Sequence, residues 1–296
     1  MAGVASPGGG DGYGAEMADA VIRAARARAR EAGARAGVVV RAVQAIDDLE
    51  RVREVLDATW PLPGGGTVME TNLIRAIEHS GGYVAAALDP TDPHGPAVGA
   101  AVAFLGRHPS DGAGWTTHLH SHAAAVRAGW RDRHVGSALK LHQRAWALEH
   151  EVPVITWTFD PLVRRNARFN LVKLGAEVAE YLPDFYGDMT DEMNAGDHSD
   201  RLLAWWRVGS ARAERAAAGS LAPYAALPSG ALRVPLPEDI VALRSRDPEA
   251  ALAWRMQVRE VMVPALADGF VVGSVDVDGA YVLLPPAAAA QEEPSS

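Results

Sequence analysis

One stretch decides the fold of this chain: Ala124-Ala-Val-Arg-Ala-Gly-Trp-Arg-Asp-Arg-His-Val-Gly-Ser-Ala-Leu139. It follows a run from Trp115 to Val126 that predicts a strand, and it enters a helix whose apolar stripe extends from Ala138 to Leu148. A tight loop that enters a helix leaves several backbone N–H groups without partners, and these groups, with the helix dipole, can hold an anion. The stretch therefore predicts an anion-binding loop between a strand and a helix.

The elements on either side of this loop predict an α+β fold with a mixed central sheet flanked by helices. Strands are predicted at residues 38–43, 83–88, 97–105, 115–126, 154–159, 176–182 and 201–208. Two helices precede the second strand, one opened by Asp47 with Glu50 and the other by Thr67 with Glu70, both at capping-box spacing. A helix also follows the fourth strand, and another, from Arg164 to Leu174, follows the fifth. Helical crossovers between strands allow parallel neighbours, so the sheet is expected to be mixed.

The chain is predicted to divide into four segments. Residues 1–37 form a disordered tail and an Ala/Arg-rich helix, 38–208 the main domain, 209–230 a linker, and 231–296 a small α/β extension. Residues 1–14 have too few apolar side chains to offset the entropy of ordering, so the helix is expected from Glu16 to Ala36. In the extension, Asp247 before Pro248 is expected to cap a helix. The extension is small enough to be marginal alone and is expected to dock on the main domain.

Composition limits the classes of function. The 296 residues include no Cys, which excludes disulfides, thiolate metal ligands and thiol nucleophiles. The formal net charge of −9 argues against a duplex nucleic-acid binder, and the longest apolar run, Ala97–Gly106, falls short of the roughly 18 residues of a membrane span. The N-terminal residues lack the basic and apolar regions of a secretory signal, so a cytoplasmic protein is expected.

Residues 124–139 resemble the strand-to-helix motif of the GNAT superfamily of acyl-CoA-dependent N-acyltransferases. In the family's core pattern, Arg/Gln-x-x-Gly-x-Gly/Ala, Arg131 and Gly136 match, and His134 stands at the middle glycine. A second stretch, Asn166–Gly175, is similar to the family region that follows the fifth strand. The resemblance implies a GNAT-type acyl-CoA N-acyltransferase fold. It also implies transfer of an acyl group, acetyl first among the candidates, to a primary amine of an unidentified acceptor.

The resemblance implies where the cosubstrate, acetyl-CoA or another acyl-CoA, binds. The pyrophosphate belongs at the loop, because small residues there let the phosphates approach the free N–H groups. The backbone N–H that stabilises the oxyanion is expected on the fourth strand near Ala124 to Val126. His tolerates left-handed backbone angles better than most residues, so His134 is compatible with the loop. The expected cosubstrate-binding residues are Ala124, Val126, Arg131, Arg133, His134, Gly136, Ser137 and Asn166.

Three histidines on the predicted fourth strand are candidates for the catalytic base. His118, His120 and His122 alternate, so all three are expected on one face, with Ala124 and Val126 continuing the same row. An imidazole with an ordinary pKa near 6.5 is suited to taking a proton from an ammonium at neutral pH. His120 is the first candidate and His122 the second. Two other interpretations stay open: structural histidines, and a zinc site for which no further ligand stands at a suitable spacing.

Two more residues are candidates for roles near the reaction. Asp160 ends the fifth strand and would orient a histidine or bind the substrate amine, or it begins a turn before Pro161. Leu171 stands where many family members place the Tyr that protonates the departing thiolate, so that acid is absent here. Tyr186, in the polar connection of residues 183–200, is the nearest replacement.

Two rival functions remain beside acyl transfer. One is a non-catalytic acyl-CoA-binding module, motivated by His134 and Leu171, and the other is a metal-dependent hydrolase built on the histidine row. A small-molecule amine is favoured over a protein as the acceptor. No nucleic-acid, membrane or metal partner is expected, and a homodimer is left open.

Overall fold

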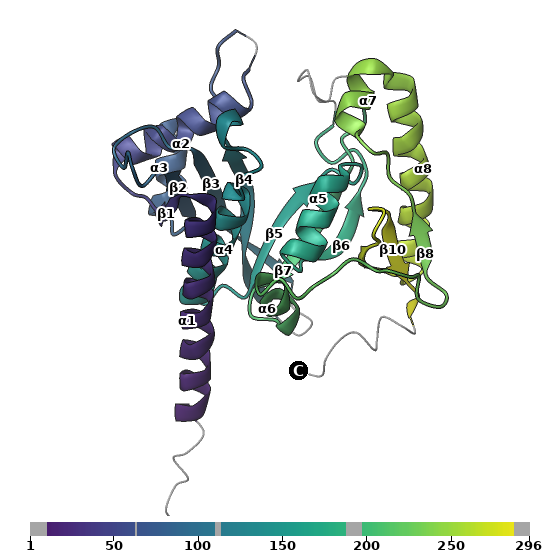
Figure 1. The fold of residues 1–296 in the computed structure, drawn as a ribbon, viewed down its shortest axis with the longest axis horizontal. Helices are drawn as coiled ribbons and strands as arrows, with labels where there is room; N and C mark the ends of the chain where they lie inside the picture. Colours follow the sequence, from purple (N-terminus) through teal and green to yellow (C-terminus); the bar gives the residue numbers. More distant parts are fainter. Residues whose placement is uncertain (1–10, 63, 110–113, 188–196, 287–296) are drawn as a thin grey trace, which may run out of the picture. The chain divides into compact units, whose positions relative to one another are not determined.

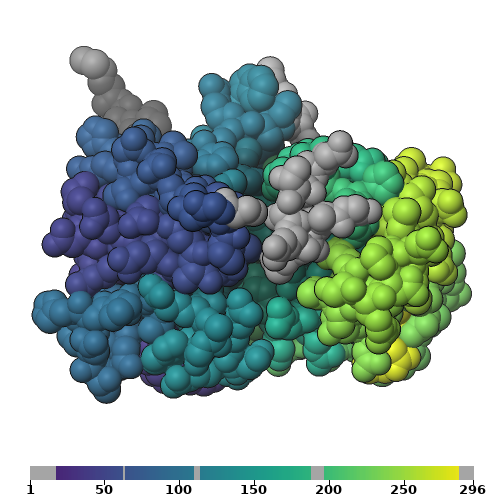
Figure 2. All heavy atoms as spheres, turned by 90° about the horizontal axis from the view of Figure 1, so that it is seen from above, coloured from purple at the N-terminus to yellow at the C-terminus, as the bar shows by residue number. Residues whose placement is uncertain are grey.

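The computed structural model of this chain describes residues 11–62, 64–109, 114–187 and 197–286; all others are grey in Figures 1 and 2. The chain divides into two compact units, residues 1–153 and 154–296. Each unit has helices packed on an antiparallel sheet, which confirms the α+β class and the helix-flanked sheet. Within the described ranges, no helix has both the length and the apolar character needed to cross a bilayer.

The first unit contains a four-stranded antiparallel sheet in the order β1-β2-β3-β4 (Figure 1). Its strands lie where the alternating and β-branched runs predict them, and the long hairpin between the second and third strands is confirmed. The bounds are β1 Val39–Ala42, β2 Tyr83–Leu88, β3 Gly99–Pro109 and β4 Trp115–Val126.

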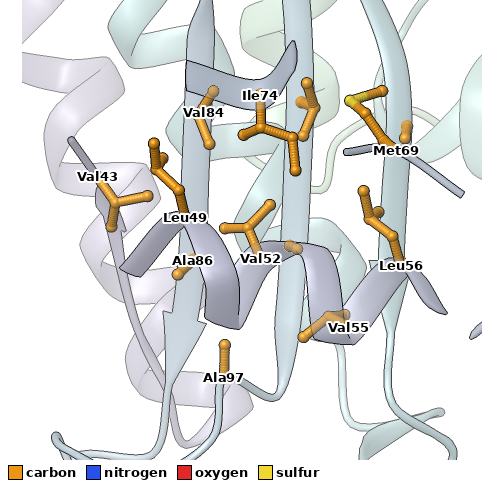
Figure 3. Close-up of a cluster of buried hydrophobic side chains, with 14 of the residues drawn as sticks. Val43, Leu49, Val52, Val55, Leu56, Met69, Ile74, Val84, Ala86 and Ala97 are labelled. Atoms are coloured by element: carbon orange, nitrogen blue, oxygen red, sulfur yellow. The ribbon is translucent and has the colours of Figure 1, made fainter. Parts of the chain in front are cut away.

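Two helices cover one face of this sheet. Leu49, Val52 and Leu56 on α2 (Ile46–Thr59) point at the strands, and Ile74 on α3 (Thr71–His79) packs beside them (Figure 3). These side chains contact Val84, Ala100, Val102, Ala123 and Ala125 from the strands. The strand residues in this cluster therefore lie on the face of the sheet that α2 and α3 cover. Burial of this apolar surface stabilises the unit at roughly 25 cal/mol per Å².

The opposite face of the sheet is covered by α4 (Val135–Glu149), and α1 (Asp11–Ala36) packs on α4. Tyr83 on β2 reaches α4, where its hydroxyl lies 2.8 Å from Nδ1 of His142 and its ring meets the edge of Trp146. Burial raises the pKa of the Tyr83 hydroxyl well above its usual value, so the group stays neutral.

The second unit has two small antiparallel sheets, ordered β5-β7-β6 and β8-β10-β9. Helix α8 and strand β9 pack on β6, so the C-terminal extension docks against strands of its own unit. The buried Tyr281 hydroxyl donates to the carbonyl of Pro161 at 2.9 Å and ties the extension to the end of β5. The bounds are β5 Val154–Phe159, α5 Arg164–Arg168, η2 Phe169–Lys173, β6 Glu177–Leu182, β7 Arg201–Arg207, α6 Ala211–Ala217, β8 Leu232–Val234, α7 Ile240–Arg246, α8 Pro248–Ala267, β9 Val271–Val275 and β10 Tyr281–Leu284.

Several helix ends differ from the sequence predictions. Helix α1 begins at Asp11, so residues 11–14 are helical, while the rest of the expected tail, residues 1–10, lies outside the described residues. Neither capping box forms: the N-cap residues of α2 and α3 are Ala45 and Glu70, and neither makes a side-chain cap bond. Thr67 instead donates to the carboxylate of Asp57 at 2.8 Å, a tertiary contact that local spacing could not predict.

In the second unit the helical turns also depart from expectation. The expected helix from Arg164 to Leu174 changes from α to π geometry at Phe169. Helix α7 was not expected; Asp239 caps it by accepting from the N–H of Ala242 at 3.0 Å. The cap predicted for α8 is present, since the Asp247 carboxylate accepts from the N–H of Ala250 at 3.0 Å.

Candidate functional site

The loop between β4 and α4 forms a left-handed turn at the helix N-terminus. Asp132 has φ 61°, and His134, the N-cap of α4, has φ 65° and ψ 10°. No side chain caps the helix, and its first bond runs from the N–H of Ala138 to the carbonyl of His134 at 3.1 Å. The N–H groups of residues 135–137 therefore have no acceptor within the helix. The left-handed conformation expected of His134 is present.

The surroundings of this loop suit an anion. A Cβ added at Gly136 would have open space around it, so a ligand can approach the backbone there. Arg131 and Arg133 are exposed, and the guanidinium of Arg133 lies 4.0 Å from the ring centre of Trp130. Stacking on the indole restricts this long side chain, so its charge is held at the mouth of the loop.

Strand β4 contains a β-bulge at His122. Val102 on β3 pairs with Ala123, but the next residue, Ala103, pairs with Ser121, so His122 is an extra residue in the ladder. A bulge leaves its extra residue outside the regular pairing and increases the local twist. The alternation of side chains is therefore interrupted at His122. Even-numbered residues before it lie on the face that odd-numbered residues occupy after it.

The change of face corrects the predicted histidine row. His120 pairs with Phe104, and Gly99, across from Val126, faces α4, because a Cβ there would lie 3.0 Å from Val135. His118, His120 and His122 thus share the α2 and α3 face, whereas Ala124 and Val126 lie on the α4 face. The prediction of one continuous row is right for the three histidines and wrong for the two residues that follow them.

The three histidines differ in environment. Nδ1 of His118 lies 3.2 Å from Nδ1 of His108, while the ring centroid of Phe104 is 5.1 Å from that of His120 and 5.9 Å from that of His122. Burial, with help from the neighbouring histidines and a lysine, lowers the pKa of His120 to about 4. Burial also lowers the pKa of His118 and His122, although the side chain of His122 is the most exposed of the three. All three imidazoles are therefore neutral at pH 7.

Metal binding finds no support on this strand. In the part of the chain that the structure describes, no group of three or more His, Asp or Glu side chains is placed to hold a metal ion. The imidazoles contact a phenylalanine ring and one another.

A buried lysine, which is not among the predicted site residues, lies beneath β4 on the α4 side. Lys140 Nζ donates to Ser121 Oγ at 2.8 Å and to Gln143 Oε1 at 3.2 Å. Burial lowers the pKa of Lys140 to about 7. Lys140 lies outside the predicted apolar stripe from Ala138 to Leu148, so the sequence pattern gave no signal for its burial.

Replacing Lys140 by Met is expected to stabilise the protein near pH 6 by about 1–2 kcal/mol. Below pH 7 the buried ammonium of Lys140 is charged in the folded chain. Removing this charge stabilises the fold by more than the loss of its hydrogen bonds to Ser121 and Gln143 destabilises it. Between pH 7 and about 10 the unfolded lysine keeps a proton that the folded one has released, so the parent gains stability as the pH rises. Urea unfolding should show that the difference in free energy of unfolding between variant and parent is smaller at pH 9.5 than at pH 6. Equal pH dependence in parent and variant would contradict the lowered pKa.

In the second unit, Asp160 lies in a buried ion cluster. Arg255 on α8 is fully buried; it donates from Nη1 to Asp160 Oδ1 at 2.8 Å and from Nη2 to Asp197 Oδ2 at 2.7 Å. Arg244 on α7 also pairs with both carboxylates. Burial opposes ionisation of Asp160, but the two guanidinium groups outweigh it and lower its pKa to about 2. The geometry favours a structural role for Asp160 and makes it a poor acceptor of an ammonium proton.

Helix α8 also holds the described ends of the connection between β6 and β7. Arg259 pairs with Asp200 and, at 3.1 Å, with Asp184. Asp200 further accepts from the Tyr181 hydroxyl at 2.6 Å and from the N–H of Asp184 at 3.1 Å. These bonds fix the backbone immediately before Tyr186.

Tyr186 itself lies against the end of β5. Its hydroxyl is 2.9 Å from Thr158 Oγ1, its N–H donates to Ser199 Oγ at 3.0 Å, and the guanidinium of Arg201 lies 5.3 Å from its ring centre. The side chain remains 48% exposed, so the hydroxyl has room for a further partner.

The remaining candidates also lie in this unit. Asn166 is half-buried on α5, and Leu171 is buried in η2. The loop residues and the histidines thus lie together in the first unit, and Asp160, Asn166 and Tyr186 lie in the second.

No protein-family model matches this sequence, and no curated protein matches it. Solved structures similar to this chain include NAA60 of Arabidopsis thaliana in complex with acetyl-CoA, at 17% identity and a TM-score of 0.45, over 57% of this chain and 99% of that one. A Desulfovibrio desulfuricans protein assigned to the GNAT family of acetyltransferases shows 19% identity and a TM-score of 0.40, over 58% and 99%. The ribosomal-protein-S18-alanine N-acetyltransferase of Escherichia coli shows 11% identity and a TM-score of 0.43, over 59% and 96%.

Proposed function

We propose that this protein transfers an acyl group, acetyl first among the candidates, from acyl-CoA to a primary amine. The observation that carries the proposal is the left-handed turn at Asp132 and His134, which opens α4 directly after β4. Free N–H groups, two exposed guanidinium groups and open space at Gly136 suit the pyrophosphate of coenzyme A. The acceptor is proposed to be a small molecule, and a cytoplasmic location stays a prediction.

The bulge on β4 is proposed as the reaction centre. The irregular pairing at His122 frees backbone beside an imidazole, which brings a candidate N–H donor for the oxyanion close to a candidate base. This places the donor at residues 122–123, slightly before the predicted Ala124 to Val126. His122 takes the ammonium proton, and the neutral amine attacks the thioester carbonyl. Collapse of the intermediate breaks the C–S bond, the thiolate takes a proton from an acid, and the new amide nitrogen gives up its extra proton, which restores the acid. Tyr186 is the proposed acid.

His122 now precedes His120 as the proposed base. Proton transfer is most effective when the pKa of the base lies near the working pH, and a pKa of about 4 makes His120 a weak proton acceptor. The non-catalytic binding module remains the second candidate, because Leu171 occupies the position expected for a family acid.

Replacing Gly136 by Asp is expected to weaken CoA binding at least tenfold without destabilising the fold. A carboxylate in the first turn of a helix interacts favourably with the helix dipole, and the open space at Gly136 accommodates the side chain. The same carboxylate would repel the pyrophosphate within a few ångströms. Isothermal titration with CoA measures the effect.

Gly129→Asp provides the matched control. Gly129 also has open space around an added Cβ, so the variant adds the same charge outside the proposed cradle. Its affinity for CoA should stay within about twofold of the parent. If both variants bind equally well, the pyrophosphate does not lie at residues 131–137.

A further inference from the structure

The connection between β6 and β7 is held together at its described ends. The N–H of Phe185 donates to the carbonyl of Ser199 at 3.2 Å, and the N–H of Tyr186 donates to Ser199 Oγ at 3.0 Å. These two bonds join residues 184–187 to residues 197–200 at the base of the connection. Tyr186, the proposed acid, is part of this base.

One arginine of the C-terminal extension bridges the two ends. Arg259 on α8 donates from Nε to Asp200 Oδ2 at 2.9 Å and from Nη2 to Asp184 Oδ2 at 3.1 Å. Asp184 lies two residues before Tyr186, and Asp200 directly follows Ser199. The guanidinium therefore spans the two segments whose backbone positions Tyr186, and its planar fork of donors suits two carboxylates at once. We call this contact the Arg259 bridge.

The electrostatics of the Arg259 bridge keep it intact at neutral pH. The Asp200 side chain is fully buried. Burial opposes its ionisation, but hydrogen bonds from Arg259 and Tyr181 outweigh burial and lower the pKa of Asp200. The hydrogen bond to Asp200 also raises the pKa of Arg259 above its ordinary value, so both groups are charged at pH 7. Asp184 has a second partner, His198, whose Nδ1 lies 2.6 Å from Asp184 Oδ1.

Burial does not hold the side chain of Tyr186 in place. It is 48% exposed, and its hydroxyl lies 2.9 Å from Thr158 Oγ1 on β5. An exposed side chain takes its position from its backbone and its polar partners. A shift of about 1 Å in the segment before Tyr186 would move the hydroxyl away from Thr158, and misplacement of that size can lower a rate by about 10²-fold.

We propose that Arg259 is a positioning residue: through Asp184 and Asp200, it holds Tyr186 where the hydroxyl can protonate the departing thiolate. The inference rests on the proposed acyl transfer, in which Tyr186 is the acid. When the C–S bond of the intermediate breaks, the proton passes from the Tyr186 hydroxyl to the sulfur of CoA. The extra proton of the new amide nitrogen then restores the hydroxyl. The C-terminal extension thus takes part in the reaction by holding a residue that lies outside it.

Hydrogen exchange of the Tyr186 N–H tests the Arg259 bridge independently of activity. Arg259→Met should increase the exchange rate at least tenfold relative to N–H groups within β7, because the local segment opens more often. Asp184→Asn is the second variant, which removes one ion pair and keeps the pair of Arg259 with Asp200. Asn tolerates the left-handed φ of 48° at position 184, and the Asp184 side chain is 45% exposed, so the fold should be preserved. This variant should show a smaller increase.

Arg246→Met is the matched control for hydrogen exchange. It removes an exposed guanidinium from α7 in the same extension and should leave the exchange rate of the Tyr186 N–H unchanged.

Turnover shows whether Arg259 acts through Tyr186. With ethylamine as the acceptor probe, Arg259→Met should lower CoA release from acetyl-CoA at least tenfold per folded molecule. The affinity for CoA should change less than about twofold, because the proposed pyrophosphate cradle lies in the first unit. In a Tyr186→Phe background, Arg259→Met should have less than about a twofold further effect, whereas two independent roles would give effects that multiply.

The outcomes separate the positioning role from the proposed function. Unchanged exchange at Tyr186 in both Arg259→Met and Asp184→Asn overturns the Arg259 bridge, even if acetyl transfer occurs. Multiplying effects in the double variant overturn the action of Arg259 through Tyr186. Faster exchange together with parental turnover in Tyr186→Phe overturns Tyr186 as the acid and, with it, the positioning role. Faster exchange in a chain that releases no CoA supports the Arg259 bridge and counts against the proposed enzyme.

Discussion

Arg255→Met is expected to lower the free energy of unfolding of the second unit by about 3–5 kcal/mol, which is the cost typical of breaking a buried ion pair from one side. Arg255 is fully buried and bridges Asp160 to Asp197. Methionine fills part of the volume but leaves two buried carboxylates with Arg244 as their remaining guanidinium partner in this cluster. Urea unfolding followed by hydrogen exchange in β5 and α8 measures the loss.

Two controls separate charge from packing. Arg246→Met removes an exposed guanidinium from the same region and should change stability by less than about 0.5 kcal/mol. Adding Asp160→Asn and Asp197→Asn to Arg255→Met removes the uncompensated charges and should recover much of the lost stability. A single Arg255→Met variant as stable as the parent would show that the cluster contributes little to folding.

His122→Ala is expected to reduce turnover by 10²- to 10⁴-fold, the usual contribution of a positioned general base. His122 is at the bulge, and burial lowers its pKa below the ordinary value. CoA affinity and melting temperature should change little, because His122 is the most exposed of the three histidines. Single-turnover rates per folded molecule give the comparison.

The pH profile identifies which histidine acts. A base works in its neutral form, so activity should fall as the pH drops through the pKa of that group. Because burial lowers the pKa of His122, the acidic limb in the parent should lie below 6.5; a limb near 4 would instead indicate His120. His118→Ala, which alters the pair with His108, is the matched control and should retain near-parental turnover. Parental turnover in His122→Ala would exclude it as the base.

The sequence predicts the strands and the loop well because their signals are local. Trp115–Val126 and Val154–Phe159 coincide with β4 and β5, since alternation and β-branched composition decide those elements. The left-handed His134 follows from a short motif between a strand and a helix. In these elements, residues close together in the sequence determine the backbone conformation.

The bulge and the ion cluster could not be predicted for opposite reasons. An extra residue at His122 leaves the alternating sequence pattern unchanged, because buried residues flank it on both sides even though they face different helices. The cluster joins Asp160 to Arg255 across 95 positions, and no spacing rule connects charges so far apart. Asp160 therefore looked like a site residue, although its partners hold it as a structural carboxylate.

The β-bulge has a consequence for how the length of this strand can vary. Deleting His122 would leave an uninterrupted ladder, because Ala123 already pairs with Val102 and Ser121 with Ala103. Residues 115–121 would keep their faces, with Ser121 toward α4 and His120 beside Phe104. A second deletion in the same strand would have no extra residue to absorb it, so the side chains on one side of it would exchange faces. The strand can therefore lose one residue at this position with its register intact.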